Sequence, residues 1–599
     1  MGQFFKQTLA SALGTLAGLL LFLGLSAGGV TLLVLNFLKE DSTTAIKDRS
    51  ILVLDLSVQI RDTRPPFTLS QIVTQEGTQQ VTLFQVLKAI ETATQDDRIV
   101  GILLKGDGIN ANSDYAILSE VRRTLANFRA AGKKILAYNT NWTEPEYYLA
   151  SVADVVTISS QGALEFNGLN SQQLFFAGAL EKFGIGVQVI RAGNYKAAIE
   201  PFTRSSISPE NRQQLQSLLG DIWGNILATV GESRRLKPQA LQKTADTQGI
   251  LDPQAAKSAG LVDRVAYYDE VAAALRKLTG EQKIKEQSFQ QISFNDYFDR
   301  VANANDEAAP NKVAIVYAEG TIVSGLGGIG QVGSAKFVKE LREVGQDKKI
   351  KAVVVRVNTP GGSATASEVI LRELQLLGQL KPVVVSMGNV AASGGYWIST
   401  GAERIFAEAS TITGSIGVFG IAFNFEKIGK NNGITSDGVK TGKLADMASV
   451  LRPKTAAELA IYQKYVNQTY NTFINKVAKS RNLPPQRVAQ IAQGRIWSGE
   501  TAQKIGLVDQ IGGLEAAVLE AAAIAKLEGD WKIVEYHPQR SLEAEILARL
   551  FQSEVSLAPS PANPLSQEVS NWKNELEILD SLNDPQGIYA RLPWHWRVK

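Results

Sequence analysis

The stretch from Ala352 to Ser386, AVVVRVNTPGGSATASEVILRELQLLGQLKPVVVS, predicts one unit of an α/β sheet. Its apolar and largely β-branched ends, Ala352–Val357 and Val383–Ser386, are typical of buried strands in a parallel sheet. Between them, Ser367–Leu377 has the spacing of an amphipathic helix. A strand, a helix and a second strand in this order indicate α/β architecture.

The same order of elements occurs earlier in the chain. We expect strands at Val100–Leu104 and Lys134–Tyr138, with a helix at Tyr115–Ala130 between them. A further strand opens each series, at Ile51–Leu56 in the first and Val313–Ala318 in the second. Short motifs recur at the same period of about 250 residues, which predicts an internal duplication. They are Gly260–Asp263 and Gly506–Asp509 (both GLVD), Glu181–Gly184 (EKFG) and Glu426–Gly429 (EKIG), and Tyr147-Tyr148 and Tyr396-Trp397.

The duplication sets the expected domain boundaries. We expect a first repeat over 46–281 and a second over 312–530, joined by a polar linker over 282–311. Residues 531–599 lie beyond the repeat, and their stretch Ser553–Ser566, which is rich in Ser and Pro, predicts a C-terminal extension that is partly disordered.

The N-terminal segment, residues 1–45, contains an uncharged and mostly apolar run from Leu16 to Leu38. A helix of about 20 residues crosses the hydrocarbon core of a bilayer, so this run predicts a transmembrane anchor. A cleaved signal peptide is the alternative. Basic residues are slightly more frequent after the run than before it, which favours a cytoplasmic body by the positive-inside rule.

The composition excludes several kinds of chemistry. The 599 residues include no cysteine and two histidines, His537 and His595, both near the C-terminus. Thiol nucleophiles, cysteine-ligated metals and histidine-rich metal sites are therefore excluded, and we expect both histidines to be dispensable for catalysis. With 62 basic and 59 acidic side chains, the chain lacks the excess of positive charge that is typical of nucleic-acid-binding proteins.

Two motifs of the second repeat point together to acyl transfer. The loop Asn358–Ser363 (NTPGGS) and the segment Gly388–Ile398 (GNVAASGGYWI) follow adjacent strands of the expected sheet. Alone, the first could be an ordinary strand-to-helix turn and Ser393 an ordinary helix N-cap. Together they supply a nucleophile, Ser393, and an oxyanion hole made of the N–H groups of Gly394 and Gly362.

A nucleophilic serine also needs a base, and the first repeat offers one. Glu144 stands where Ser393 stands in the second repeat, so the first repeat cannot run this chemistry alone. Its segment Arg191–Arg204 contains Lys196, which aligns with Ala445. A lysine acts as a base only when burial lowers its pKa. The alternatives are that Lys196 is a solvated surface residue, or that Lys443 of the second repeat is the base.

These motifs resemble the signal peptide peptidase A proteases (protease IV) in their long, internally duplicated form. The resemblance covers roughly residues 1–530 and rests on PGGS, ASGGYW and GNYKA in combination. It implies tandem domains of the Clp-protease/crotonase fold group with an N-terminal transmembrane helix. It also implies a Ser–Lys dyad of Ser393 and Lys196, with Gly362 and Gly394 as oxyanion hole. Ser415, in Thr413–Gly417 (TGSIG), is the candidate for holding the Lys196 amine.

The function implied by the resemblance is that of a membrane-anchored serine endopeptidase. It would degrade residual signal peptides and other hydrophobic peptide segments, need no metal or cofactor, and assemble as a homotetramer on the extracytoplasmic face. That last implication opposes the weak charge asymmetry. Two other functions stay open on sequence alone: a crotonase-type acyl-CoA enzyme, and a membrane scaffold whose dyad is vestigial.

Overall fold

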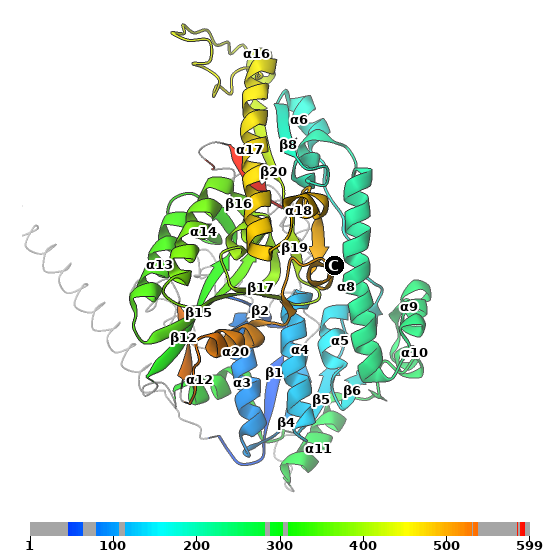
Figure 1. Cartoon of the computed structure of the whole chain (residues 1–599). Helices are drawn as coiled ribbons and strands as arrows, with labels where there is room; N and C mark the ends of the chain where they lie inside the picture. The colour runs from blue at the N-terminus through cyan, green and yellow to red at the C-terminus, as the bar shows by residue number, and fades with distance from the viewer. Residues whose placement is uncertain are drawn as a thin grey trace, which may run out of the picture. The chain divides into compact units, whose positions relative to one another are not determined.

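The computed structural model describes residues 46–63, 80–106, 114–281, 288–303, 310–529, 531–536, 584 and 587–592. Apart from residues 46 and 47, all of them belong to one compact unit, 48–539 with 558–599 (Figure 1). The expected membrane segment Leu16–Leu38, the Ser- and Pro-rich stretch and both histidines lie outside the described residues. No helix within the described ranges combines the length and apolar character that crossing a bilayer requires.

The first repeat builds a parallel sheet of six strands, and the three runs expected to be strands, Ile51–Leu56, Val100–Leu104 and Lys134–Tyr138, correspond to three of them. The six strands are β1 (Ser50–Asp55), β4 (Ile99–Lys105), β5 (Lys134–Asn139), β6 (Val155–Ile158), β10 (Arg264–Val265) and β11 (Gln291–Ser293). In space they lie in the order β10-β6-β5-β4-β1-β11. The last of them, β11, lies in the segment expected to be a linker.

The second repeat builds the same arrangement and adds to it. Its strands are β12 (Asn311–Glu319), β15 (Ile350–Thr359), β17 (Val383–Ala392), β18 (Arg404–Ala407), β22 (Gln510–Ile511) and β23 (Trp531–Tyr536). In addition, β19 (Ile412–Gly414) pairs with β17, and β21 (Ile496–Ser498) pairs with β19. Strands β22, β18, β17, β15, β12 and β23 are parallel and correspond in order to the six strands of the first sheet. Each copy thus ends on a strand beside its first strand, and β23 lies in the expected C-terminal extension.

Paired hydrogen bonds confirm the predicted duplication. The Tyr147 hydroxyl donates to the carbonyl of Leu261 at 2.7 Å, and the Tyr396 hydroxyl donates to that of Leu507 at 2.8 Å. The aspartate of each GLVD motif bonds an arginine from a long helix in the same way: Arg234 contacts Asp263 at 2.8 Å and Arg481 contacts Asp509 at 2.7 Å.

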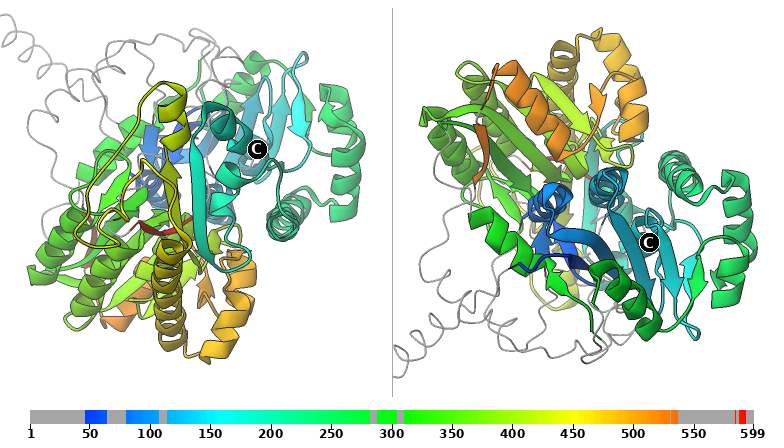
Figure 2. Two further views of the ribbon diagram at one scale, coloured as in Figure 1. Left: turned by 90° about the horizontal axis from the view of Figure 1, so that it is seen from above. Right: turned by 90° about the horizontal axis from the view of Figure 1, so that it is seen from below.

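Helices cover the sheets, and Figure 2 shows the parallel sheet of the first copy, mostly in blue and cyan, apart from the green strands of the second copy's parallel sheet. The helices of the first copy are α3 (Leu83–Gln95), α4 (Tyr115–Ala130), α5 (Glu144–Ala150), α6 (Ala177–Phe183), η1 (Ala197–Ile199), α7 (Glu200–Thr203), α8 (Pro209–Arg234), α9 (Pro238–Thr247), α10 (Pro253–Ser258) and α11 (Tyr268–Thr279), followed by α12 (Phe294–Asn303). Those of the second are α13 (Ser334–Gln346), α14 (Ala364–Gly378), α15 (Gly394–Ser399), α16 (Glu426–Asn431), α17 (Ala456–Arg481), α18 (Pro485–Ile491), α19 (Gly499–Lys504) and α20 (Leu514–Ile524). The predicted helix Tyr115–Ala130 is observed with the same bounds.

The second sheet is buried on both faces, which explains its continuous apolar strands. Val313, Ile315 and Val354 point to one face, where α20 packs on them. Val316 and Val353 point to the other, where they join the core formed with α13 and α14. Because side chains alternate along a strand, a sheet covered twice needs apolar residues at every position.

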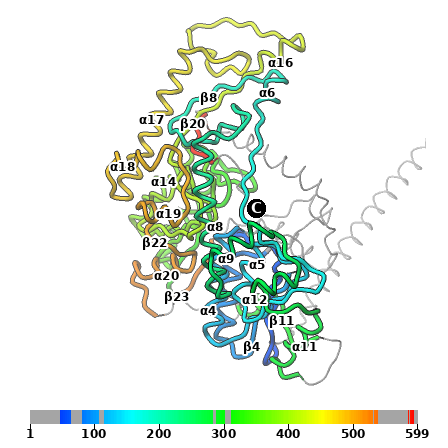
Figure 3. Tube along the Cα trace, turned by 90° about the vertical axis from the view of Figure 1, so that its right-hand side faces the viewer, coloured from blue at the N-terminus to red at the C-terminus, as the bar shows by residue number. Residues whose placement is uncertain are grey.

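A third sheet joins the two copies. It contains β13 (Thr321–Val323), β14 (Gln331–Gly333), β16 (Gly361–Ser363), β20 (Val418–Asn424) and β24 (Ile588–Arg591) together with β8 (Gly186–Ala192) of the first copy, in the order β14-β13-β16-β24-β20-β8. Strand β8 pairs antiparallel with β20 along its whole length (Figure 3). Two short pairs complete the described strands, β2 (Gln59–Arg61) with β3 (Gln80–Thr82) and β7 (Leu164–Phe166) with β9 (Gly249–Leu251).

A buried ion cluster also links the copies. Arg356 on β15 donates to Asp62 at 2.8 Å and to Glu120 at 2.7 Å, and all three side chains are almost fully buried. Asp62 accepts a further bond at 2.8 Å from the amide of Asn358, which precedes the glycine loop. Burial alone would lower the pKa of Arg356, but Asp62 and Glu120 together raise it. The guanidinium therefore stays charged between two carboxylates of the other copy.

Removing Arg356 should destabilise the chain strongly. Arg356→Met leaves two buried carboxylates of the first copy without their cation, a change that costs about 3–5 kcal/mol. Urea unfolding measures this as a fall in the midpoint without a large change in slope. The control is Arg342→Met, which breaks an exposed contact with Glu373 on the surface of the same copy and should have little effect. Equal shifts for the two variants would contradict the account.

Candidate active site

Ser393 stands at the junction of β17 and α15 in a strained conformation. Its φ is 56° and its ψ is −112°, a region that residues with a side chain rarely occupy. Its amide donates to the carbonyl of Gly414 at 2.8 Å, and its carbonyl accepts from Trp397 at 2.8 Å. Its fully buried side chain makes no capping bond to α15. The strand end therefore fixes the backbone while the Oγ is directed away from the helix.

Lys196 of the first copy reaches this hydroxyl. Its Nζ lies 2.7 Å from Ser393 Oγ, 3.0 Å from Ser415 Oγ and 3.1 Å from the carbonyl oxygen of Ser415. The Lys196 side chain is 1% exposed, so the alternative of a solvated surface lysine is wrong. Burial lowers the pKa of Lys196 well below its ordinary value.

The three contacts suit an uncharged amine. A neutral amine has two N–H donors and one lone pair. Donation to the two oxygen atoms of Ser415 leaves the lone pair for the hydroxyl proton of Ser393. The three hydrogen-bond partners of Nζ among the described residues are neutral oxygen atoms, so no carboxylate among them offsets the cost of burying a positive charge. The arrangement therefore places the Lys196 amine against the Ser393 hydroxyl, with Ser415 on its other side.

Two loops position the lysine. The turn after β8 runs through Gly193, whose φ is 106° and where a Cβ would lie 2.5 Å from the backbone of Gln493. The amide of Tyr195 donates to the carbonyl of Gln493 at 2.9 Å. Gly494, with a φ of 77°, lies against Lys196 itself, where a Cβ would be 2.7 Å from the lysine Cβ. Glycine is required at both positions for the copies to approach this closely.

The predicted glycine loop lies beside Ser393. Gly361 has a φ of 91°, and a Cβ there would lie 2.5 Å from the amide nitrogen of Gly394. Gly362 forms the centre of β16, and a Cβ there would lie 1.9 Å from the carbonyl oxygen of Ile322. Ser363 ends the loop by accepting a bond from the amide of Ala366 as the N-cap of α14. The structure therefore brings the glycine loop and the start of α15 together, as the sequence predicts.

Ser415 is also held in a strained turn. Its φ is 50°, and its amide donates to the carbonyl of Arg495 at 2.7 Å. It joins β19 to β20, the strand that pairs with β8, so its position follows the same inter-copy pairing that carries Lys196.

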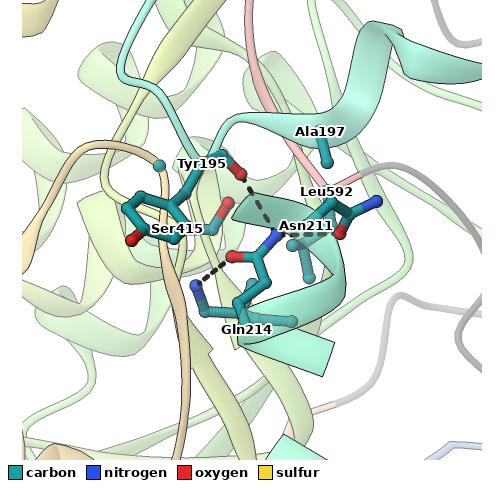
Figure 4. Close-up of a pocket in the computed structure, with 8 residues that line it drawn as sticks. Tyr195, Ala197, Asn211, Gln214, Ser415 and Leu592 are labelled. Carbon is teal, nitrogen blue, oxygen red and sulfur yellow. Dashed lines mark hydrogen bonds between the residues drawn. The ribbon is translucent and has the colours of Figure 1, made fainter. Parts of the chain in front are cut away.

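A small pocket opens next to the lysine (Figure 4). Gln214 of α8 donates to the carbonyl of Tyr195 at 3.2 Å and accepts from the amide of Ile496 at 3.2 Å, so it joins the two loops. The pocket is lined by Tyr195, Ala197, Asn211, Gln214, Ser415, Gly494, Ile496 and Leu592. Sequence reasoning missed Gln214 and Leu592, because neither lies in a repeated motif. Within the described ranges no cluster of three or more acidic or histidine side chains could hold a metal ion.

The first copy has a structural residue where the second has Ser393. Glu144 is buried at the start of α5 and accepts bonds from the amides of Asn167 at 3.1 Å and Gly168 at 3.0 Å and from the hydroxyl of Tyr115 at 3.1 Å. Burial raises the pKa of Glu144. The other candidate base, Lys443, is exposed in the loop after α16.

A serine hydroxyl in contact with a buried lysine amine, beside glycine amides, is an arrangement typical of a serine hydrolase. Residues 127–282 and 375–528 match peptidase family S49. This chain belongs to that family, in a form with two copies of the domain, and it is a serine protease. The finding favours peptide hydrolysis over the acyl-CoA and scaffold alternatives.

Several named proteases are similar in sequence to this chain over most of its length. "Protease 4" of Salmonella typhi is 35% identical over 95% of this chain and 94% of its own, and "Protease 4" of Haemophilus influenzae is 33% identical over 91% of each. "Serine protease SPPA, chloroplastic" of Arabidopsis thaliana is 31% identical over 86% of this chain and 74% of its own. Among solved structures, a ClpP1 mutant from Listeria monocytogenes covers 34% of this chain and 94% of its own at 14% identity and a TM-score of 0.24, too weak a likeness to define the fold.

Replacing Lys196 should stabilise the chain while it abolishes activity. Lys196→Met removes an amine whose pKa is lowered by burial in the folded chain, whereas the unfolded chain protonates it near pH 7, and we expect relief of this difference to outweigh the lost hydrogen bonds. Because the unfolded state binds the extra proton, the wild-type chain should gain stability relative to the variant as pH rises toward about 10.4.

Urea unfolding over a pH series measures this difference, and hydrolysis of a peptide substrate measures activity. Lys443→Met, at an exposed lysine, should change neither. A large loss of stability in Lys196→Met near pH 7 would contradict the account, because it would mean that the buried amine is charged.

Proposed function

We propose that this chain is a membrane-anchored serine endopeptidase in which Ser393 is the nucleophile and Lys196 the general base. The observation that carries the proposal is the 2.7 Å contact between Lys196 Nζ and Ser393 Oγ, made across the two copies in a buried site. A serine becomes nucleophilic only next to such a base, and a lysine becomes a base only when it is desolvated.

The mechanism uses groups of this chain alone. The amine of Lys196 takes the proton of the Ser393 hydroxyl, and the oxygen attacks the scissile carbonyl of a bound peptide. The resulting ammonium returns the proton to the leaving amine, which departs with the C-terminal part of the peptide. A water molecule then loses a proton to Lys196 and attacks the acyl-enzyme; as the ester bond to Ser393 breaks and the N-terminal part leaves, the ammonium of Lys196 returns this proton to the Ser393 oxygen.

The amides of Gly362 and Gly394 would bind the oxyanion that forms in both steps. Backbone donors fixed in advance stabilise this charge without rearranging during the reaction. Ser415 would act as a positioning residue, since its two oxygen atoms accept the amine hydrogens that do not face Ser393.

The substrates would be hydrophobic peptide segments, including residual signal peptides. This rests on the resemblance to signal peptide peptidase A proteases and on the apolar residues of the pocket, such as Ala197 and Ile496. We also propose that Leu16–Leu38 anchors the chain in a membrane, that the catalytic body is extracytoplasmic and that the chain forms a homotetramer. The two copies would have the Clp-protease/crotonase fold, with the domain boundaries predicted from the sequence.

Covalent labelling by a fluorophosphonate probe tests the dyad. Labelling should vanish in Ser393→Ala and slow by about 10²–10⁴-fold in Lys196→Ala, which loses general-base catalysis. Lys443→Ala is the matched control and should label at the wild-type rate. Peptide hydrolysis that persists in Ser393→Ala would overturn the proposal.

The pH dependence of the reaction reports the protonation of Lys196. Only the free amine accepts the serine proton, so kcat/KM should rise with pH and level off above an apparent pKa that lies well below about 10.4. A profile measured from pH 5 to 10 on a peptide without titratable groups would show this limb. A profile that still rises steeply at about pH 10 would assign the reaction to an ordinary lysine.

A further inference from the structure

A series of buried polar side chains leads to the loop between β8 and η1 that carries Lys196 (the lysine loop). The series begins at Glu200, the first residue of α7, and continues through Asn211 and Gln214 in the first two turns of α8. The side-chain nitrogen of Asn211 donates to Oε2 of Glu200 at 3.0 Å, and that of Gln214 donates to Oδ1 of Asn211 at 3.0 Å. Each of the three side chains is at most 3% exposed, so their polar atoms need hydrogen bonds from within the protein.

Glu200 determines which way the two side-chain amides face. A carboxylate offers only acceptors, so the nitrogen of Asn211 must point to Glu200 and its oxygen to Gln214. The nitrogen of Gln214 then faces Asn211, which leaves the Gln214 oxygen to accept a bond elsewhere. The amide and the hydroxyl of Ser208 also donate to Glu200, so the carboxylate is held at the start of α8. The series therefore has one direction, and Gln214 presents a fixed face to the lysine loop.

Gln214 connects the lysine loop to the second copy. Its side-chain nitrogen donates to the carbonyl of Tyr195 at 3.2 Å, and its oxygen accepts from the amide of Ile496 at 3.2 Å (Figure 4). Tyr195 directly precedes the lysine, and Ile496 follows the residue whose carbonyl accepts from the amide of Ser415 at 2.7 Å. One side chain thus ties the backbone that carries the lysine to the backbone that holds Ser415.

We infer that Gln214 is a positioning residue for the Lys196 amine, with its own amide oriented through Asn211. The inference rests on the proposed function, because it takes Lys196 as the base. Nζ lies 2.7 Å from Ser393 Oγ, and a base must come within about 2.6–3.2 Å of the atom whose proton it takes. A displacement of about 1 Å can slow a reaction by about 10²-fold. Fixing the backbone next to the lysine therefore controls the reaction without contact with the reacting atoms.

The two side-chain amides transmit orientation and keep negative charge away from the base. Burial lowers the pKa of Lys196. A carboxylate in contact with the lysine loop would favour the ammonium and raise this pKa again. Here Glu200 bonds Asn211, and the group that bonds Tyr195 is a neutral amide, that of Gln214. A charged residue can thus order the loop while the lysine keeps its lowered pKa.

Gln214→Met in the full-length chain tests the inference. Methionine has a similar length but makes neither bond, while the amide of Tyr195 still donates to the carbonyl of Gln493 at 2.9 Å, so the loop stays attached. For a fluorogenic peptide, kcat should fall by about 10–100-fold with little change in KM. The rising limb of kcat/KM should move to higher pH, because a looser loop lets water reach the amine. A raised KM at unchanged kcat would overturn the inference, since it would make Gln214 a substrate contact.

Two other residues of α8 serve as controls. Gln213 is exposed and accepts from the hydroxyl of Tyr195 at 3.0 Å, so Gln213→Met should keep the wild-type kcat. Asp221 joins the two copies by accepting from the hydroxyl of Ser498 at 2.5 Å. Asp221→Ala should lower the midpoint of urea unfolding and leave kcat unchanged. A kcat that falls as far in Asp221→Ala as in Gln214→Met would contradict a positioning role, because any loosening between the copies would then suffice.

Asn211→Leu tests the direction of the series. It frees the amide of Gln214 to rotate but leaves that side chain in place, so kcat should fall several-fold and less than in Gln214→Met. The double variant should be no slower than Gln214→Met alone, because Asn211 acts through Gln214. Losses that multiply would show that the two residues act separately, against the inference. If Gln214→Met does not fold, Asn211→Leu carries the test, and a wild-type kcat and pH profile in that variant would overturn the inference.

Failure of this inference can be distinguished from failure of the dyad. Suppose that Ser393→Ala and Lys196→Ala lose activity while Gln214→Met keeps the wild-type kcat, KM and pH profile. The dyad would then stand and the positioning role of Gln214 would be wrong. If Ser393→Ala retains activity, the proposed function itself is wrong.

Discussion

The antiparallel pairing of β8 with β20 is the constraint on which the rest of the site depends. Through this pairing, a strand of the first copy is part of a sheet of the second. The turn that follows β8 places Lys196 in contact with Ser393. Neither copy holds both groups, so the contact between Lys196 and Ser393 forms only when the two copies are joined in this register. The buried cluster around Arg356 reinforces the join, because its carboxylates come from the other copy and one of them also holds Asn358 beside the glycine loop.

Function here is obtained at the expense of local stability. Ser393 and Ser415 adopt a positive φ without being glycine, and Lys196 is buried among neutral oxygen atoms. Each feature raises the energy of the folded state, and under the proposed mechanism each serves the reaction: the strained turn places the Ser393 Oγ against Lys196, and burial lowers the pKa of the amine.

Much of the fold and the central pair of the site could be predicted from the sequence, for a physical reason. Apolar runs and helical spacing are local signals, and the repeated GLVD and tyrosine motifs aligned the copies well enough to show that Ser393 and Lys196 each lack a counterpart. The ion cluster could not be predicted, because Asp62 and Arg356 are far apart in the sequence and each looks like an ordinary surface charge. Strand β24 could not be predicted either, since a short segment with no counterpart in the repeats gains its structure only from β16 and β20.

The protonation state of Lys196 tests the account most directly. In a chain labelled with carbon-13 lysine, the Cε resonance of Lys196 can be identified by its absence from the Lys196→Met spectrum. At about pH 8, where an ordinary lysine is protonated, we predict the chemical shift of a free amine, with protonation only on further acidification. A resonance that keeps the shift of an ammonium until about pH 10.4 would contradict the account, because a charged Lys196 could not take the proton of Ser393.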